Sequence, residues 1–101
     1  MAYYRLTVAG FTYTEAEAKA IWNTSNAGGL RDSKKGFTQV AAIRLSGTVA
    51  PNASVWADVT IVENWLATLG KLSESNLPTG DANASAAAGR IGDWITANHC
   101  N

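Results

Sequence analysis

Residues 54–66, SVWADVTIVENWL, constrain the fold most strongly, because they fit two incompatible structures. As a helix, they and the residues that follow align one apolar stripe, made of Val55, Val59, Val62, Leu66 and Leu69. As a strand, they alternate, with Val55, Ala57, Val59 and Ile61 on one face. Five of the eight residues from 55 to 62 are β-branched, which carries a modest cost in a helix and suits a pleated surface. We therefore expect a strand over 54–62 and a short helix over 63–69, with a single helix as the alternative.

Two further segments predict strands that pair with this one. Residues 3–9 place Tyr4, Leu6 and Val8 on one face, with other side chains between them. Residues 37–46 alternate in a similar way, and the segment that follows contains Pro51, which is typical of a turn. Because two strands are only marginally stable in water, we expect a three-stranded sheet formed by residues 3–9, 37–46 and 54–62.

Local signals also predict two longer helices. Thr14 followed by Glu17 is a capping box, and two glycines at 28 and 29 supply a stop, so we expect a helix over about 14–26. The C-terminal stretch predicts a helix over 83–98. Small residues recur in it every four positions, at Ala84, Ala88 and Gly92. This spacing allows another helix to approach closely, either from a second subunit in a homo-oligomer or within the domain.

These elements predict a single α+β domain over residues 1–101, with helices 14–26, 63–69 and 83–98 covering one face of the sheet. Charged residues are only 16% of the chain, against a usual quarter, and eight basic residues balance eight acidic ones. No net field draws such a chain to nucleic acid or anionic lipid, and its low charge favours self-association. We expect no membrane span and no signal peptide, and a location inside the cell on synthesis or in an assembled particle.

Catalytic chemistry is not indicated. The single histidine, His99, and the single cysteine, Cys100, are neighbours near the end of the chain, where a rigid scaffold rarely positions such a pair. One of each is too few for a structural zinc site within one chain. We therefore expect no enzymatic activity, no metal and no cofactor. A basic loop formed by Arg31, Lys34 and Lys35 could contact phosphate, although such a cluster is more often a solvated turn.

The sheet face that the helices leave open is the candidate binding surface. It would collect two aromatic and two arginine side chains among hydroxyl groups: Tyr3, Arg5, Thr7, Arg44, Trp56 and Thr60. Aromatic and arginine side chains are enriched at protein interfaces, and on an open sheet they also suit the stacking of unpaired bases. A merely solvated sheet face is the plainer interpretation.

Strands followed by helices, with a free sheet face, are similar in architecture to the coat proteins of single-stranded RNA phages. The dimers of those proteins join their sheets and bind RNA on them. The capped helix that we expect near residue 14 of this chain is a departure from the architecture of those proteins. We therefore expect a non-catalytic, self-assembling structural or protein-interaction subunit that forms homo-oligomers. Binding of single-stranded RNA or of a small ligand on the open sheet face is the alternative.

Overall fold

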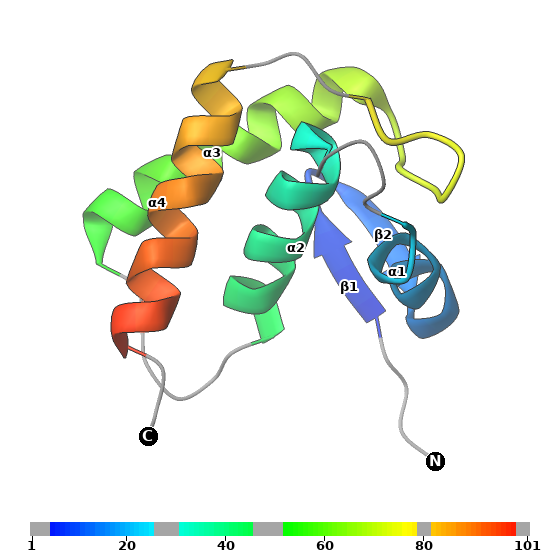
Figure 1. The fold of residues 1–101 in the computed structure, drawn as a ribbon, viewed down its shortest axis with the longest axis horizontal. Helices are drawn as coiled ribbons and strands as arrows, with labels where there is room; N and C mark the ends of the chain where they lie inside the picture. The colour runs from blue at the N-terminus through cyan, green and yellow to red at the C-terminus, as the bar shows by residue number, and fades with distance from the viewer. Residues whose placement is uncertain (1–4, 26–30, 46–51, 79–81, 99–101) are drawn as a thin grey trace.

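The computed structural model describes residues 5–25, 31–45, 52–78 and 82–98. Within these ranges the chain forms a two-stranded antiparallel sheet followed by four helices (Figure 1). The strands are β1 (Arg5–Val8) and β2 (Phe11–Thr14). The helices are α1 (Glu15–Trp22), α2 (Asp32–Leu45), α3 (Ala53–Leu69) and α4 (Ala82–Asn98).

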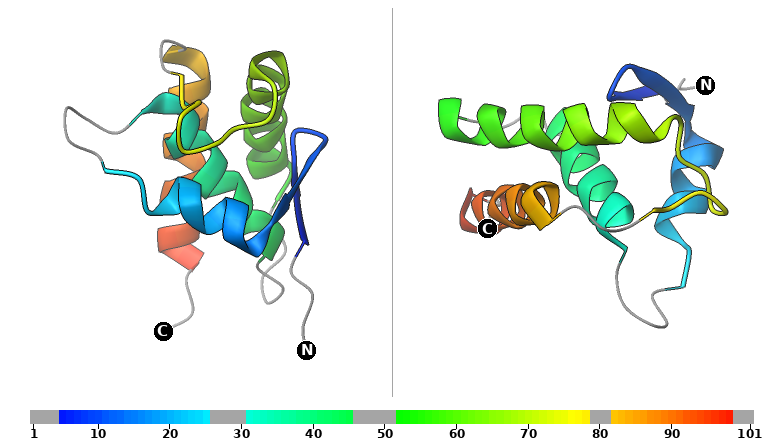
Figure 2. Two further views of the ribbon diagram at one scale, coloured as in Figure 1. Left: turned by 90° about the vertical axis from the view of Figure 1, so that its right-hand side faces the viewer. Right: turned by 90° about the horizontal axis from the view of Figure 1, so that it is seen from above.

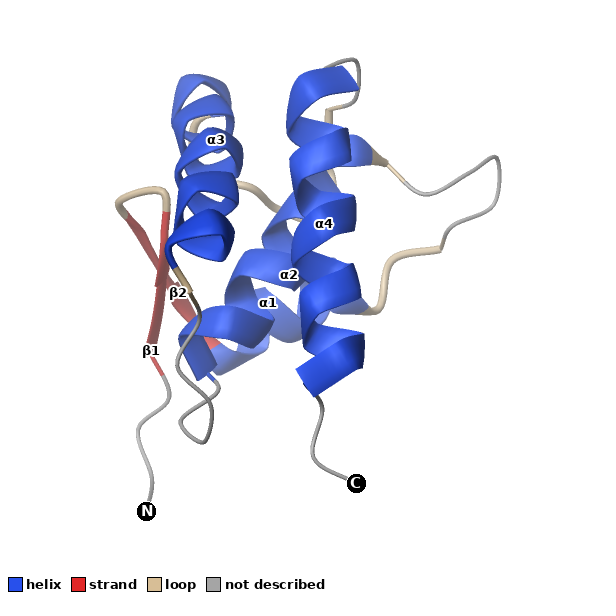
Figure 3. Cartoon of the chain, turned by 90° about the vertical axis from the view of Figure 1, so that its left-hand side faces the viewer, coloured by secondary structure: helices blue, strands red, loops and turns tan. Residues whose placement is uncertain are grey.

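The central element of the fold is α2, which packs against α1, α3, α4 and β1. Helices α3 and α4 lie side by side against it (Figures 2 and 3). The β1–β2 hairpin and α1 lie on the opposite side of α2 from α4 (Figure 1). Every element contributes apolar side chains to the core, among them Tyr13, Phe37, Val62, Leu66 and Ile91.

The expected three-stranded sheet is wrong, because residues 54–62 form part of α3 and the described residues of 37–46 form part of α2. Residues 63–69, expected as a separate short helix, are the continuation of α3. The helical alternative accounts for this element, since Val55, Val59, Val62 and Leu66 are all buried. Burying one such side chain contributes about 1.5–3 kcal/mol. A β-branched residue costs a helix at most about 0.7 kcal/mol, so burial decides the outcome.

The same argument applies to α2. Its buried residues Phe37, Val40 and Ala41 recur at helical spacing and point into the core. Residues 37–45 also contain small side chains such as Ala42, which fit either period, so the alternation seen in the sequence was not a reliable sign of a strand.

β1 falls within the predicted strand 3–9, but its partner β2 was not expected. The two strands pair in register from Arg5 with Thr14 to Val8 with Phe11. Ala9 and Gly10 connect them, with φ angles of 56° and 84°. Positive φ at both central residues defines the type I′ turn, whose twist matches that of a hairpin. This two-residue turn explains why residues directly before the capped helix are extended.

The predicted capping box at the start of α1 is confirmed. The Glu17 N–H donates to Thr14 Oγ1 at 3.2 Å, and the Thr14 N–H donates to Glu17 Oε1 at 2.8 Å. Helix α1 ends at Trp22, before the predicted end at 26. Helix α4 agrees with the predicted helix 83–98 to within one residue at its start. Among the described residues, no helix is both long and apolar enough to cross a membrane.

Removing the charge of Glu17 is expected to lessen the acid sensitivity of the fold. The Thr14 N–H and the Lys71 ammonium hold the pKa of Glu17 below its ordinary value of 4.5. Its carboxylate therefore stabilises the folded state above that value, and the stabilisation is lost as the pH falls through the lowered pKa. Glu17→Gln keeps an acceptor oxygen but cannot ionise. In urea unfolding from about pH 5 to pH 2, it should lose less stability than the wild type. An equal loss in both proteins would contradict this account.

Candidate interaction surface

The outward-facing side of α3 is exposed and carries no charged residue. Its exposed side chains, which we call the outer face of α3, are Ala53, Ser54, Trp56, Ala57, Thr60, Asn64, Ala67 and Thr68. The solvent face of a helix ordinarily carries charged and polar side chains. In this helix the only charged residues are Asp58 and Glu63, and both are partly buried. The outer face of α3 is therefore a neutral strip that runs along the helix.

Trp56 is the largest side chain on this face and is 41% exposed. The Arg44 guanidinium, from the last turn of α2, lies 5.7 Å from the centroid of its ring, which is a cation–π contact. Arg44 Nη2 is also 2.7 Å from Glu63 Oε1. The second oxygen of Glu63 accepts the Ala9 N–H at 3.0 Å. One edge of the outer face is therefore fixed by contacts that join α2, α3 and the hairpin.

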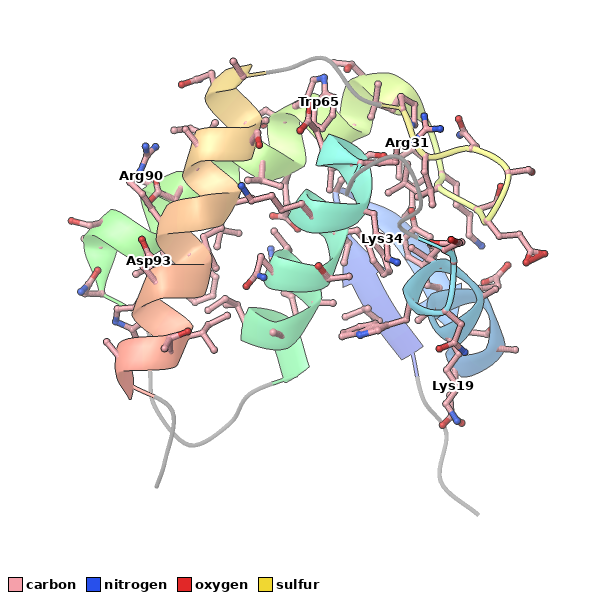
Figure 4. All side chains as sticks on the ribbon, in the orientation of Figure 1. Lys19, Arg31, Lys34, Trp65, Arg90 and Asp93 are labelled. Carbon is pink, nitrogen blue, oxygen red and sulfur yellow. The ribbon has the colours of Figure 1, made fainter. Side chains whose placement is uncertain are left out.

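The opposite edge of the outer face has a second ion pair. Arg90, from α4, donates to Asp58 through Nε and Nη2 at distances of 2.9–3.2 Å (Figure 4 labels Arg90). The hydrogen bonds to Asp58 raise the pKa of Arg90. Both carboxylates of α3 are thus neutralised by arginines from neighbouring helices, and the neutral strip lies between two ion pairs.

The structure brings together three of the six residues predicted for the open sheet face, although it does so on helices. Arg44 contacts Trp56 across α2 and α3, and the Thr60 hydroxyl donates to the Trp56 carbonyl at 3.0 Å within α3. Thr7 is exposed on β1, opposite Thr12. Arg5 belongs to β1, but its side chain is not described. Tyr3 lies outside the described residues.

The three residues predicted as a basic loop have separate surroundings. Helix α2 begins at Asp32, so Lys34 and Lys35 lie in its first turn. Lys34 is only 5% exposed, and its Nζ donates to the Thr24 carbonyl at 2.8 Å. Lys35 Nζ donates to Ser85 Oγ on α4 at 3.4 Å. Arg31 is exposed just before the helix (Figure 4 labels Arg31 and Lys34).

The small residues of α4 face the interior of the same chain. Ala84 and Ala88 are buried, and α4 packs against both α2 and α3. A Cβ added to Gly92 would lie 3.3 Å from the side chain of Gln39 on α2. Ala84, Ala88 and Gly92 therefore let the backbones of α4 and its neighbours approach closely within the domain.

Among the described residues, two of the hollows are lined by side chains that do not belong to the outer face of α3. One, of about 570 Å³, is lined by Asp32, Lys35, Ala82, Ser85 and Ala86. The other, of about 260 Å³, is lined by Glu17, Ala20, Lys71, Leu72, Ser73 and Glu74. In each, the lysine is already bound to an oxygen of the chain, Lys35 to Ser85 and Lys71 to Glu17. Neither hollow presents a free cation from its lining to an incoming ligand.

Metal ligands do not cluster in the part of the chain that the structure describes, where no three His, Cys, Asp or Glu side chains could hold an ion together. His99 and Cys100 lie outside the described residues. No protein-family model, no curated protein and no solved structure matches this chain. A functional assignment therefore depends on the geometry of the chain itself.

The neutral face of α3 is the feature that the sequence prediction missed, and the sequence contains a signal for it. Positions 53, 57, 60, 64 and 67 alternate spacings of four and three, and all are small or uncharged. That period belongs to a helix, so the pattern was hidden as long as 54–62 was interpreted as a strand.

Proposed function

We propose that this protein is a non-catalytic protein-interaction subunit that binds a protein surface through the outer face of α3. One observation carries the proposal: the exposed face of a 17-residue helix has no charged residue and presents a tryptophan that is 41% exposed. Such a face contributes nothing to the core of its own domain. A protein partner would remove it from water.

The composition and layout of this region support the proposal. The centres of protein interfaces are depleted of charged residues and enriched in tryptophan and arginine, and their rims are polar. Here Trp56, on the outer face of α3, lies beside Arg44 from α2. The ion pairs of Glu63 and Asp58 lie along the two edges of that face. Because both carboxylates are already paired with arginines, a contact that covers them leaves neither carboxylate buried without a counter-charge.

Single-stranded RNA has less support as a partner. Binding to phosphates depends on lysine and arginine side chains that are available to them. Among the described residues, Lys19, Lys71, Arg44 and Arg90 each form an ion pair with a carboxylate. The likeness to phage coat proteins rested on a three-stranded sheet with an open face, whereas the described residues form a two-stranded sheet. We also propose that the protein is located inside the cell on synthesis or in an assembled particle.

Site-specific photocrosslinking tests the proposal. A benzophenone amino acid at position 60, on the outer face of α3, should give a discrete protein adduct when the full chain is made in its native host. The same group at position 19, which is exposed on α1, should not give that adduct. Adding Trp56→Ala to the position-60 protein should greatly reduce the adduct, because Trp56 is the principal apolar contact.

Two results would overturn the proposal. One is an adduct of equal yield from positions 60 and 19, which would indicate random collision. The other is an adduct at position 60 that contains only nucleic acid, which would favour RNA binding. The variants are informative only when folded, so each should show the helical circular dichroism and the urea midpoint of the parent protein.

A further inference from the structure

We infer that Glu63 is the positioning residue of this surface: it holds the Arg44 guanidinium against the Trp56 indole and so orients the ring for its contact. The inference rests on the proposed function and concerns how the same surface is built. Glu63 does not belong to the outer face of α3, and its side chain is only 17% exposed. It acts on Trp56 through Arg44.

The course of α3 brings Glu63 to the same side of the helix as Trp56. The two residues are seven apart in the sequence, which is close to two turns, or about 10 Å along the axis. Helical side chains lean toward the N-terminus, so Glu63 extends back along the helix in the direction of the indole. Arg44, from α2, contacts both side chains. Its guanidinium lies 5.7 Å from the ring centroid, and its Nη2 lies 2.7 Å from Glu63 Oε1.

Arg44 depends on this carboxylate to stay against the ring. Its side chain is long and 39% exposed, so it loses considerable conformational freedom when it is held in one place. An exposed cation–π contact is weak by itself. The hydrogen bond from Arg44 to Glu63 joins two ionised groups and is therefore the stronger of the two contacts. The indole has a fixed neighbour because Glu63 holds the guanidinium there.

Glu63 is itself fixed by two donors. Its Oε1 accepts from Arg44, and its Oε2 accepts the Ala9 N–H of the hairpin turn at 3.0 Å. An ordinary surface ion pair joins two mobile side chains and contributes little. Here the carboxylate is already bound to the backbone of another element, so it has less freedom to lose. Because both oxygens are used, a side chain with a single acceptor oxygen cannot replace Glu63.

The second carboxylate of α3 provides a matched control. Asp58 has the same charge as Glu63, lies in the same helix and pairs with an arginine from a neighbouring helix, Arg90. In the part of the chain that the structure describes, the cation–π contact of Trp56 is with Arg44 and not with Arg90. Asp58→Asn therefore removes one carboxylate from α3 but leaves Arg44 in place.

Fluorine NMR on the isolated protein tests the positioning. Fluorotryptophan labels the four tryptophans, and Trp56→Phe identifies the resonance of residue 56. Glu63→Gln should move that resonance toward its position in the urea-unfolded chain, because glutamine offers one acceptor oxygen to two donors. Arg44→Ala should move it in the same direction, and Asp58→Asn should leave it unchanged. In an Arg44→Ala background, Glu63→Gln should add no further shift, because Glu63 acts through Arg44.

The position-60 photocrosslink measures the consequence for binding. Glu63→Gln should lower the adduct yield by about two- to tenfold, because the partner must then order a side chain that was already fixed. Asp58→Asn should leave the yield unchanged. The urea midpoint identifies variants that remain folded. Arg44→Ala leaves the bond between Glu63 and Ala9 intact, so it carries both measurements if Glu63→Gln lowers the midpoint.

Three results would overturn the inference. The first is a Trp56 resonance that stays in place in folded Glu63→Gln and Arg44→Ala. The second is an equal shift in Asp58→Asn, and the third is an adduct yield that neither Glu63→Gln nor Arg44→Ala changes. If the fluorine shifts are as expected but position 60 gives no protein adduct in the parent protein, the positioning of Trp56 holds and the proposed function fails.

Discussion

Replacing Gly36 with alanine is expected to destabilise the fold by about 1–3 kcal/mol, although alanine is the better helix former. Gly36 lies in α2 where α3 packs against it. A Cβ at this position would lie 2.8 Å from Val62 Cγ1, which is too close for two carbon atoms. Val62 is fully buried and β-branched, so its side chain has little freedom to move away. The two helices would have to separate, and the gain in helix propensity, about 1 kcal/mol, does not offset this.

Gly89 is the matched control for this substitution. It also lies within a helix, but a Cβ added there would meet only the end of the Lys35 side chain, at 3.5 Å. That side chain is flexible, so Gly89→Ala should stabilise the protein by up to about 1 kcal/mol through helix propensity. Urea unfolding followed by circular dichroism measures both variants. If Gly36→Ala is as stable as the wild type, the close approach of α2 and α3 is wrong.

Tyr13→Phe is expected to destabilise the fold by about 1–3 kcal/mol, because it leaves a buried donor without an acceptor. The Leu72 N–H donates to the Tyr13 hydroxyl at 2.9 Å in the core. The Tyr13 ring packs edge-on against Phe37, with the ring centroids 4.9 Å apart, and phenylalanine keeps that contact. The difference in free energy of unfolding at pH 7 therefore reports the lost hydrogen bond. Equal stability of the two proteins would show that the bond is unimportant.

The pH dependence of that difference provides a second measurement. Burial raises the pKa of Tyr13 above its ordinary value of 10.0. When the protein unfolds, the pKa of Tyr13 returns to its ordinary value. The neutral hydroxyl therefore contributes fully to the free energy of unfolding below pH 10, and this contribution is lost as the pH rises through the higher pKa of the folded state. The stability gap between wild type and Tyr13→Phe should therefore narrow as the pH is raised past about 10. A gap that stays constant or widens there would contradict the raised pKa.

The parts of the fold that the sequence predicted correctly are those decided by local chemistry. The capping box of Thr14 and Glu17 is a contact between residues three apart, and it defined the start of α1. The bounds of α4 followed from its composition and periodicity in the same way. In α2 and α3 the local preference of β-branched residues pointed to strands, and packing overrode it. Burial of Val59 and Val62 depends on residues far along the chain, which propensity does not include.

The candidate site, like the fold, was predicted correctly only in part. The sequence prediction placed Arg44 near Trp56 on neighbouring strands, and the structure places them 5.7 Å apart on crossing helices. The neighbourhood was therefore anticipated, but the geometry that produces it was not. The position of Arg44 depends on where the last turn of α2 crosses α3. Crossing positions depend on close contacts such as that of the Val62 side chain with the backbone of Gly36, and a single sequence does not reveal them.

The Glu63 carboxylate connects the outer face of α3 to the β1–β2 hairpin. One of its oxygens binds Arg44, the guanidinium that lies against Trp56, and the other accepts the Ala9 N–H at the tip of the hairpin. Contact at Trp56 and closure of the hairpin turn are therefore linked through a single carboxylate. By thermodynamic reciprocity, we expect a partner that steadies Arg44 to slow hydrogen exchange at the Ala9 N–H. We expect a substitution that loosens the turn to weaken binding of the same partner. Hydrogen exchange at the Ala9 N–H is therefore the expected readout of a contact at Trp56.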